Sequence, residues 1–248
     1  GKTNLMDAVY YLSFCKSATN PVDSQNVMHD ADFFVLQGFY ETDDGEPEEV
    51  YCGLKRRQKK QFKRNKKEYS RLSDHIGLIP LVMVSPADSC LILGGSEERR
   101  RFMDVVISQF DREYLDALIR YNKALLQRNT LLKAEVEPDD ELMSVWEEMM
   151  AQAGEAVYRK RYEFIMEFIP VFQSFYSFIS KDGEKVSLQY QSHVAHGEFL
   201  QQLKEVRQRD RILGYTSRGV HKDDLLMSLG EFPIKREGSQ GQNKTYLI

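Results

Sequence analysis

The chain has 248 residues, of which 42% are hydrophobic and 29% charged, and its formal net charge is −4. These values are ordinary for a soluble globular protein of one domain or two lobes, and no apolar run approaches the roughly 20 residues that a membrane-spanning helix needs. The cysteines, Cys15, Cys52 and Cys90, are odd in number and widely spaced, which argues against a disulfide framework or a zinc ribbon and predicts a cytoplasmic protein.

The chain opens with GKTNLMDAVYYLS, where apolar residues recur at helical spacing and predict a helix over residues 3–14. Gly1, Lys2 and Thr3 match the end of the phosphate-binding loop G-x-x-x-x-G-K-[ST]. In that loop the lysine reaches the β and γ phosphate oxygens and the hydroxyl binds Mg²⁺. Because the N-terminus of a helix attracts anions, we expect a phosphate beside these residues.

The next part of the chain is predicted to be rich in β-structure. Residues 33–40 and 50–55, joined by the turn signal Asp43-Asp44-Gly45, predict a hairpin, with a third strand after Arg64-Asn65. The run LVMV at 81–84, which Ser85-Pro86 ends, is typical of a strand buried on both faces.

From Ser96 the pattern becomes helical. A helix is predicted to begin there, a second to cover residues 114–133, and a third to run from Leu142 to Phe168, where Pro170 kinks or ends it. The apolar stripe predicted for the second helix consists of Leu115, Leu118, Asn122, Leu125, Asn129 and Leu132. Residues 96–180 are therefore expected to form a helical lobe.

After this lobe, Asp182-Gly183 turns the chain into a predicted strand at 186–190, followed by a helix over 197–209 and a strand pair, 224–229 with 232–236. The chain closes with EGSQGQNKTYLI. Its four residues Ser239, Gln240, Gly241 and Gln242 supply a hydroxyl, an unhindered glycine amide and a helix N-terminus, which together can hold a phosphate.

This S-Q-G-Q stretch resembles the signature motif of ABC-type ATPases, in the form found in the RecF family of DNA replication and repair proteins. Four further blocks resemble that family in the same order: GKTNLMDAVYYLS, SPADSCLILGGSEERRRFMD, YNKALLQRNTLLK and SRGVHKDDL. The blocks span nearly the whole chain. Two positions depart from the family pattern, because Val220 stands where proline is expected and Lys222 where arginine is expected, which puts a bidentate role at position 222 in doubt.

The resemblance implies an α/β fold, namely an ABC-type P-loop ATPase lobe with mixed sheets and an inserted helical lobe. The expected division is residues 1–95 for the first part of the ATPase lobe, 96–180 for the helical lobe and 181–248 for the second part. The family pattern also places a glycine loop before Gly1 and an acidic Walker B strand after Ile248. The chain is therefore expected to be an internal part of a longer protein, and not to hydrolyse ATP by itself.

The resemblance further assigns ATP and Mg²⁺ to Gly1, Lys2, Thr3 and Asn4, with the metal bound through the Thr3 hydroxyl. The signature residues 239–242 would act on the ATP of a second subunit, so that ATP holds a homodimer together, and no residue of the chain is assigned as catalytic. The implied function is recombinational repair and replication restart. The protein would bind gapped, single-stranded and duplex DNA and help mediators of the RecO and RecR type to load the recombinase.

Residues 55–67, KRRQKKQFKRNKK, hold nine basic residues and no acidic one, and we call them the basic segment. It is either a solvated hairpin whose charges protect a sheet edge or a surface that contacts DNA phosphates. The candidate DNA contacts are Lys59, Lys60, Lys63 and Arg64, and residues 99–101 are the next candidate. Because side chains of a strand alternate between two faces, only part of this set can meet one duplex.

Two other classes of protein remain as alternatives. A chromosome-maintenance ATPase that acts as an ATP-gated scaffold would share the motifs but usually has much longer coiled-coil arms. A P-loop kinase would share only the first motif, and the S-Q-G-Q stretch argues against it. Asp88 is more often a turn residue or a cap than part of a site, and His221 is more often structural than catalytic.

Overall fold

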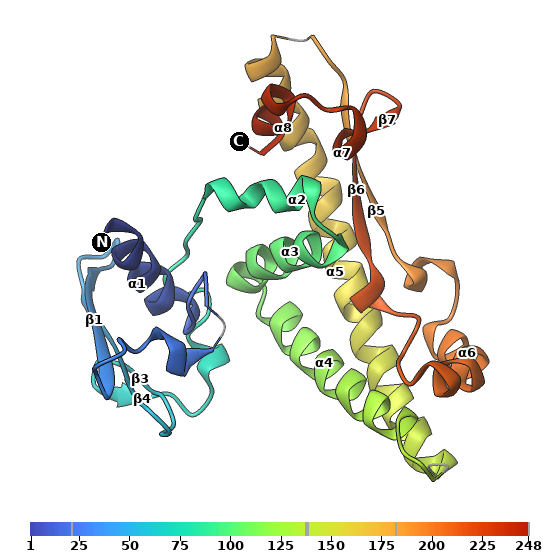
Figure 1. The fold of residues 1–248 in the computed structure, drawn as a ribbon, viewed down its shortest axis with the longest axis horizontal. Coiled ribbons are helices and arrows are strands. Elements are labelled where there is room, and N and C mark those ends of the chain that lie inside the picture. Colours follow the sequence, from blue (N-terminus) through green and yellow to red (C-terminus); the bar gives the residue numbers. More distant parts are fainter. Residues whose placement is uncertain (21, 137–138, 182, 248) are drawn as a thin grey trace. The chain divides into compact units, whose positions relative to one another are not determined.

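The computed structural model describes residues 1–247 except 21, 137–138 and 182, so that Asp182 of the predicted turn lies outside the described residues. The chain divides into two compact units, Gly1–Val84 and Ser85–Ile248, and each is described by itself. Both contain helices and antiparallel strands, which gives the mixed α/β class that the sequence predicts (Figure 1). The division into lobes at residues 95 and 180 stays a prediction.

The N-terminal unit combines one long helix with a four-stranded antiparallel sheet whose strand order is β1-β2-β3-β4. Its elements are α1 (Lys2–Phe14), η1 (Asp23–Asn26), β1 (Phe33–Glu41), β2 (Pro47–Lys55), β3 (Gln61–Arg64), β4 (Lys67–Glu68) and η2 (Leu72–Asp74). The predicted first helix and the hairpin are confirmed. The third strand, β3, lies before the turn at Asn65 and Lys66, and only the two residues of β4 follow that turn.

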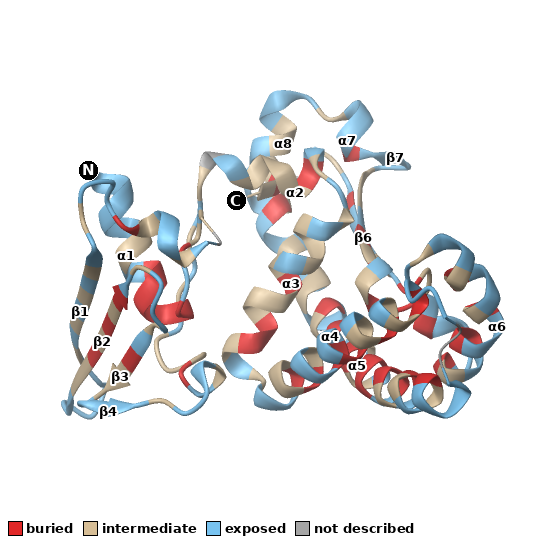
Figure 2. Ribbon diagram, turned by 60° about the horizontal axis from the view of Figure 1, so that its bottom comes forward, coloured by how far each residue is buried: buried red, intermediate tan, exposed pale blue. Residues whose placement is uncertain are grey.

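One face of the sheet packs against α1. The buried residues of this small core are Tyr11, Leu12, Cys15, Val50, Cys52 and Phe62. In β1 and β2 the even-numbered side chains face α1 and the odd-numbered side chains face away, as the period of two requires. Figure 2 shows the result, with buried positions on β2, β3 and the second half of α1, and none on β1.

Residues 81–84, all of them described, do not form a strand, so the prediction for LVMV is wrong. Val82 is 82% exposed and Val84 67% exposed. A short apolar run signals only that its residues could be buried; whether they are depends on a neighbouring strand, which local sequence does not encode. Directly after this run, the amide of Ser85 donates to the carboxylate of Asp88, which confirms Asp88 as a helix cap.

The C-terminal unit contains the long helices and a three-stranded antiparallel sheet of order β5-β6-β7. Its elements are η3 (Pro86–Ser89), α2 (Cys90–Leu93), α3 (Ser96–Phe110), α4 (Arg112–Leu132), α5 (Asp140–Ser180), β5 (Val186–Gln191), η4 (His193–His196), α6 (Phe199–Leu213), η5 (Val220–Lys222), β6 (Asp224–Leu229), β7 (Phe232–Pro233), α7 (Ile234–Glu237) and α8 (Gln240–Leu247).

The three predicted long helices are confirmed, but the stripe predicted for α4 is displaced by about one residue. The buried positions of this helix are Tyr114, Ala117, Tyr121, Ala124, Arg128 and Leu132. Asn122 of the predicted stripe is exposed. The prediction followed the leucines, whereas the side of α4 that is buried carries alanines, tyrosines and an arginine. Small and amphipathic residues such as these fit a close helix contact, but they give a weak periodic signal.

Helix α5 does not end at Pro170 and continues for ten residues to Ser180. Its aromatic side chains are spaced four residues apart, and the ring centroids of Phe164 and Phe168 lie 5.6 Å apart, those of Phe168 and Phe172 5.9 Å. A proline inside a helix costs about 3 kcal/mol, because it removes one hydrogen bond and crowds the preceding turn. Packing of this aromatic row on the core of the unit offsets that cost.

In the last part of the chain, the predicted strand β5 and helix α6 are confirmed, but the predicted strand over 232–236 is mostly wrong. Only Phe232 and Pro233 pair with β6, and Ile234 begins the short helix α7. Pro233 cannot donate to a ladder, which ends the pairing there. In the described part of the chain, every helix is too short or too polar to cross a membrane.

Candidate nucleotide and nucleic-acid sites

The N-terminus of α1 is open to solvent. Residues 1–4 are all exposed, and the helix begins directly after Gly1. The amides of Asn4 and Leu5 donate to the Gly1 carbonyl at 3.1 and 3.4 Å, whereas the amides of Lys2 and Thr3 precede the first helical hydrogen bond. The first turn carries no acidic residue. This end of the helix therefore offers free donors, one lysine and the positive end of the dipole to an anion.

The other end of α1 is fixed in the core. The side chains from Tyr10 to Phe14 are buried, and the Leu12 carbonyl oxygen lies 2.6 Å from Nε2 of the buried His75. Burial lowers the pKa of His75 below its ordinary value, so the ring is neutral near pH 7. Midway along the helix, the carboxylate of Asp7 accepts hydrogen bonds from the hydroxyl of Ser17 and the amide of Ala18. The exposed first turn is thus held on a rigid base.

The signature stretch begins α8, as the sequence predicts. The amide of Gln242 donates to Oγ of Ser239 at 3.2 Å, and the amide of Ser239 donates to Oε1 of Gln242 at 2.6 Å. These reciprocal bonds have the pattern of a capping box. Behind them, the hydroxyl of the buried Tyr246 donates to the Ser187 carbonyl at 2.9 Å, which fastens α8 to β5. Ser239, Gln240 and Gly241 stay exposed.

Nothing within the described chain explains why position 241 is a glycine. A Cβ atom at Gly241 would meet the Ser239 hydroxyl at 3.9 Å, which is ordinary contact, and the backbone there has no positive φ. At Gly238, by contrast, a Cβ atom would lie 2.5 Å from Oδ1 of Asn243 and 2.7 Å from the Ile234 carbonyl oxygen. Gly238 is therefore required by packing, whereas packing within the described chain does not require a glycine at position 241.

The other blocks singled out by the sequence come together inside the C-terminal unit and bind one another. Arg99 forms an ion pair with Asp224 at 2.6 Å, and Arg100 donates to the Asp223 carbonyl at 2.7 Å. Arg161 binds Asp104 at 2.7 Å and Asp223 at 2.9 Å. Residues 99 and 100 thus have structural partners. This weakens the prediction that these two arginines are the next candidates for DNA contact.

His221 also has structural partners. Its Nδ1 lies 2.7 Å from Oη of Tyr121 and its Nε2 lies 3.0 Å from the Thr216 carbonyl oxygen. Burial lowers the pKa of His221 to about 4, so the ring is neutral at physiological pH. Lys222, at the position where the family pattern has arginine, is exposed and places its ammonium 5.2 Å from the centroid of the Tyr215 ring. These contacts support the structural interpretation of His221.

The basic segment is not a uniform surface, because several of its cations bind groups of their own unit. Nζ of Lys60 lies 2.8 Å from the carboxylate of Asp23 and 3.1 Å from the Tyr11 hydroxyl, and the Lys60 side chain is only 11% exposed. Arg64 makes a two-pronged ion pair with Glu48, which holds the pKa of that carboxyl below its ordinary value. Arg56 donates to four backbone carbonyls between residues 24 and 31.

The remaining cations of the segment point outward. Lys59 is exposed in the β2–β3 connection, and Lys63 lies on the outer face of β3, with Nζ 5.6 Å from the centroid of the Tyr51 ring. The composition of the basic segment does not distinguish paired from exposed side chains among its nine cations. Only the strand alternation, which separates Lys63 from Arg64, gives a local signal of which ones face solvent.

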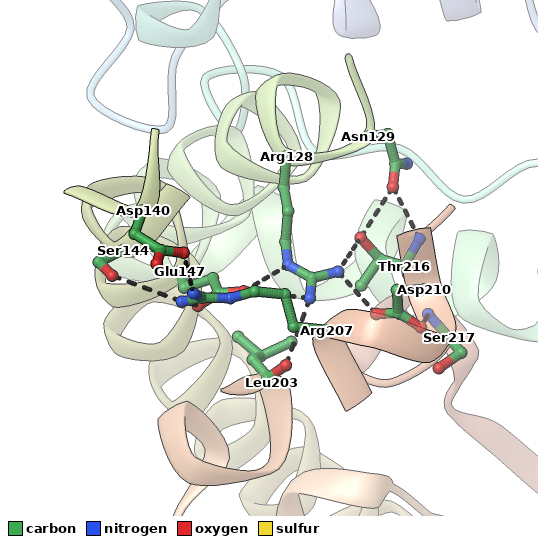
Figure 3. A network of polar contacts seen from close by, with 10 residues as sticks. All are labelled: Arg128, Asn129, Asp140, Ser144, Glu147, Leu203, Arg207, Asp210, Thr216 and Ser217. Carbon is green, nitrogen blue, oxygen red and sulfur yellow. Dashed lines mark hydrogen bonds and ion pairs between the residues drawn. The ribbon is translucent and has the colours of Figure 1, made fainter. Parts of the chain in front are cut away.

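Sequence reasoning missed a buried charged network between α4, α5 and α6 (Figure 3). Arg128 and Glu147 are fully buried and form an ion pair at 3.1 Å, and Arg128 binds the buried Asp210 at 2.7 Å. Arg207 binds Glu147 from the other side at 2.6 Å. Arg128 and Asn129 belong to a quoted family block, so the signal was present, but no spacing rule identifies their partners on other helices.

Curated relatives match the chain over its whole length. The DNA replication and repair protein RecF of Phocaeicola vulgatus is 77% identical over 248 residues, which are 100% of this chain and 67% of the relative. The protein of the same name from Bacteroides fragilis is 75% identical, and that from Parabacteroides distasonis is 57% identical, with the same coverage. No family model matches the chain.

Two solved structures are similar as well. The recombination mediator protein RecF with ATP in the RecFOR pathway has a TM-score of 0.92 and 26% identity, covering 100% of this chain and 69% of that chain. The same mediator protein described as RecF-ATPrS has a TM-score of 0.91 and 25% identity, covering 99% and 69%.

Proposed function

Because the chain belongs to the RecF family of DNA replication and repair proteins, we propose that it is part of an ATP-dependent DNA-binding protein of recombinational repair and replication restart. On this proposal the whole protein binds gapped, single-stranded and duplex DNA and helps RecO-type and RecR-type mediators to load the recombinase. Its support is the similarity to solved structures that are named as a recombination mediator with ATP in the RecFOR pathway.

The proposal that the protein binds ATP rests on the first turn of α1, which is exposed and carries no acidic residue. We propose that Lys2 neutralises phosphate oxygens, that the Thr3 hydroxyl is a ligand of Mg²⁺, and that Gly1 and Asn4 approach the nucleotide with their backbone. A lysine at a helix N-terminus combines a positive charge with free amide donors, and both can bind the phosphate oxygens of a nucleoside triphosphate.

Replacing Lys2 with alanine in the full-length protein tests this assignment. We expect the affinity for ATP to fall at least about tenfold, because a charge-assisted contact at a partly desolvated phosphate is worth about 1.5–3 kcal/mol. Lys204→Ala, which removes an exposed lysine from α6, is the matched control and should bind ATP as the parent protein does. If calorimetry gives the Lys2→Ala and parent proteins the same affinity for ATP, the assignment of Lys2 to an ATP site is wrong.

We further propose that Ser239, Gln240, Gly241 and Gln242 contact the ATP of a second subunit, so that ATP stabilises a homodimer. The unused space at Gly241 and the exposed cap of α8 support this. A valine at position 241 should leave ATP binding by each subunit intact and abolish ATP-dependent dimerisation, since its side chain fills that space. Gly95→Val is the control, because a Cβ at Gly95 meets nothing within 4 Å. Sedimentation with a non-hydrolysable ATP analogue measures both; a persisting dimer of the Gly241→Val protein contradicts the proposal.

For DNA we propose contacts from the outward cations of the basic segment, Lys59 and Lys63, and a weaker contribution from Arg64. Lys60 is better explained by its contacts with Asp23 and Tyr11. Lys59→Gln combined with Lys63→Gln should lower the affinity for duplex DNA about equally for all sequences. The slope of log K against log salt should fall by up to roughly 0.9 per lost contact. Unaltered affinity and slope would mean that this hairpin is only a solvated edge.

A further inference from the structure

A pocket of about 570 Å³ opens beside the connection between β2 and β3, entirely within the N-terminal unit. Its apolar wall includes Val22, which is 46% exposed, Leu72, which is 38% exposed, and the ring of Tyr69. Tyr69 is fixed in place, since its hydroxyl lies 3.0 Å from Nδ1 of the buried His75 and its ring meets the His75 ring edge-on. A volume of this size is typical of sites for small molecules.

The rim of the pocket is positive. Its lining includes four cations, at positions 55, 57, 59 and 60, and two carboxylates, at positions 23 and 68. Lys60 and Asp23 neutralise each other. Lys55, Arg57 and Lys59 are exposed, and across the described residues none of the three takes part in an ion pair. These three cations share the lining with an apolar wall and with one further carboxylate, that of Glu68, so the lining is positive on balance and suits an anionic ligand with an apolar part.

The backbone of Arg57 adds an independent observation. Its φ is +63°, in the left-handed region that residues other than glycine, asparagine and aspartate seldom adopt. The connection is held in this shape from inside, because the neighbouring Arg56 donates to the carbonyls of Ala31, Val27 and Met28 at 3.0 Å. No contact of the Arg57 side chain within the described chain accounts for an arginine at a strained position. The exposed Arg57 side chain is therefore available to a ligand.

We propose that this pocket binds one unpaired nucleotide of a DNA strand, with its phosphate against Lys55, Arg57 and Lys59 and its base along Val22, Leu72 and Tyr69. The inference rests on the proposed DNA-binding function and names the part of the DNA that is recognised. A base inside a duplex is paired and stacked, so it cannot enter a pocket without being extruded. A base of a single strand enters at no such cost and gains contact with an aromatic wall. The pocket therefore selects the single-stranded side of a gap.

The test compares two labelled probes with the full-length protein: a blunt duplex, and the same duplex with a short single-stranded extension. Arg57→Asn removes the charge while asparagine tolerates the left-handed backbone. Its affinity for the extended probe should fall about tenfold, the size expected for one charged contact, and its affinity for the blunt duplex should change much less. Lys181→Asn is the matched control, because Lys181 is exposed and has a φ of +56°. It should bind both probes like the parent.

Two further measurements complete the test. A probe whose single-stranded extension lacks bases should bind only slightly more tightly than the blunt duplex, because its sugar-phosphate chain has no base to pack on the apolar wall. The thermal midpoint of Arg57→Asn should equal or exceed that of the parent, which shows that the variant is folded. Equal weakening of the two probes would overturn the pocket assignment and leave the proposed DNA function standing. Failure of the parent protein to bind either probe would overturn the DNA function itself.

Discussion

Arg128→Met should be among the most destabilising single substitutions in the C-terminal unit. The guanidinium of Arg128 has no exposed surface and donates to Asp210 at 2.7 Å, to Thr216 at 2.9 Å and to the Leu203 carbonyl at 3.3 Å, besides its ion pair with Glu147 (Figure 3). Methionine has a similar length but no donor. The substitution therefore leaves buried carboxylates without the cation that compensates their burial.

The size of the effect follows from what each carboxylate retains. Glu147 keeps Arg207 at 2.6 Å, whereas among the described residues Asp210 keeps only the amide of Ser217 at 3.1 Å. Most of the loss therefore comes from Asp210. Removal of one partner of a buried ion pair costs about 3–5 kcal/mol, and we expect the free energy of unfolding to fall by that amount. Arg209→Met, at an exposed position of the same helix as Asp210, should change it by less than about 0.5 kcal/mol.

Urea unfolding measured by the fluorescence of Trp146 is a suitable assay, because this is the only tryptophan of the 248 residues and it precedes Glu147 in α5. In the Arg128→Met background, Asp210→Asn should restore part of the lost stability, since a neutral amide needs no cation. A loss below about 1 kcal/mol for Arg128→Met, or strictly additive effects in the double variant, would refute the account of this network.

Three other outcomes are expected. The pKa of His221 is lowered to about 4 from an ordinary 6.5, so the unfolded chain binds more protons between these values. The free energy of unfolding should then decrease as the pH falls from 6.5 to about 4, and an imidazole titration by NMR with a midpoint near 6.5 would contradict this. Lys60→Met should lower the free energy of unfolding by about 1–3 kcal/mol, because the charged hydrogen bonds of Lys60 are lost, while Lys59→Met should change it by less than about 0.5 kcal/mol. A lower urea midpoint for Lys59→Met than for Lys60→Met would be inconsistent with the contacts of Lys60. Pro170→Ala should raise the thermal midpoint, by a gain of about 1–3 kcal/mol in α5, and a lowered midpoint would show that the proline serves the packing.

The sequence by itself determined the features that depend on near neighbours in the chain. Helical periodicity located α1, α3, α4 and α5, and the turn at 43–45 predicted the β1–β2 hairpin. The capping role of Asp88 was also readable, because the two residues of a capping box lie three positions apart in the chain. The quoted family blocks identified the family for the same reason: each is a short string that can be recognised without its partners.

Tertiary structure alone decided which of these residues are free. Lys60 is 37 positions from Asp23 in the sequence, and Arg99 is 125 positions from Asp224, so no local pattern shows that these cations are neutralised. The displaced stripe of α4 has the same origin, because the buried side of a helix is chosen by the elements that cover it. Burial, desolvation and ion pairing are properties of contacts between distant segments. They separate the structural cations, such as Lys60, from the exposed ones at the rim of the pocket, such as Arg57.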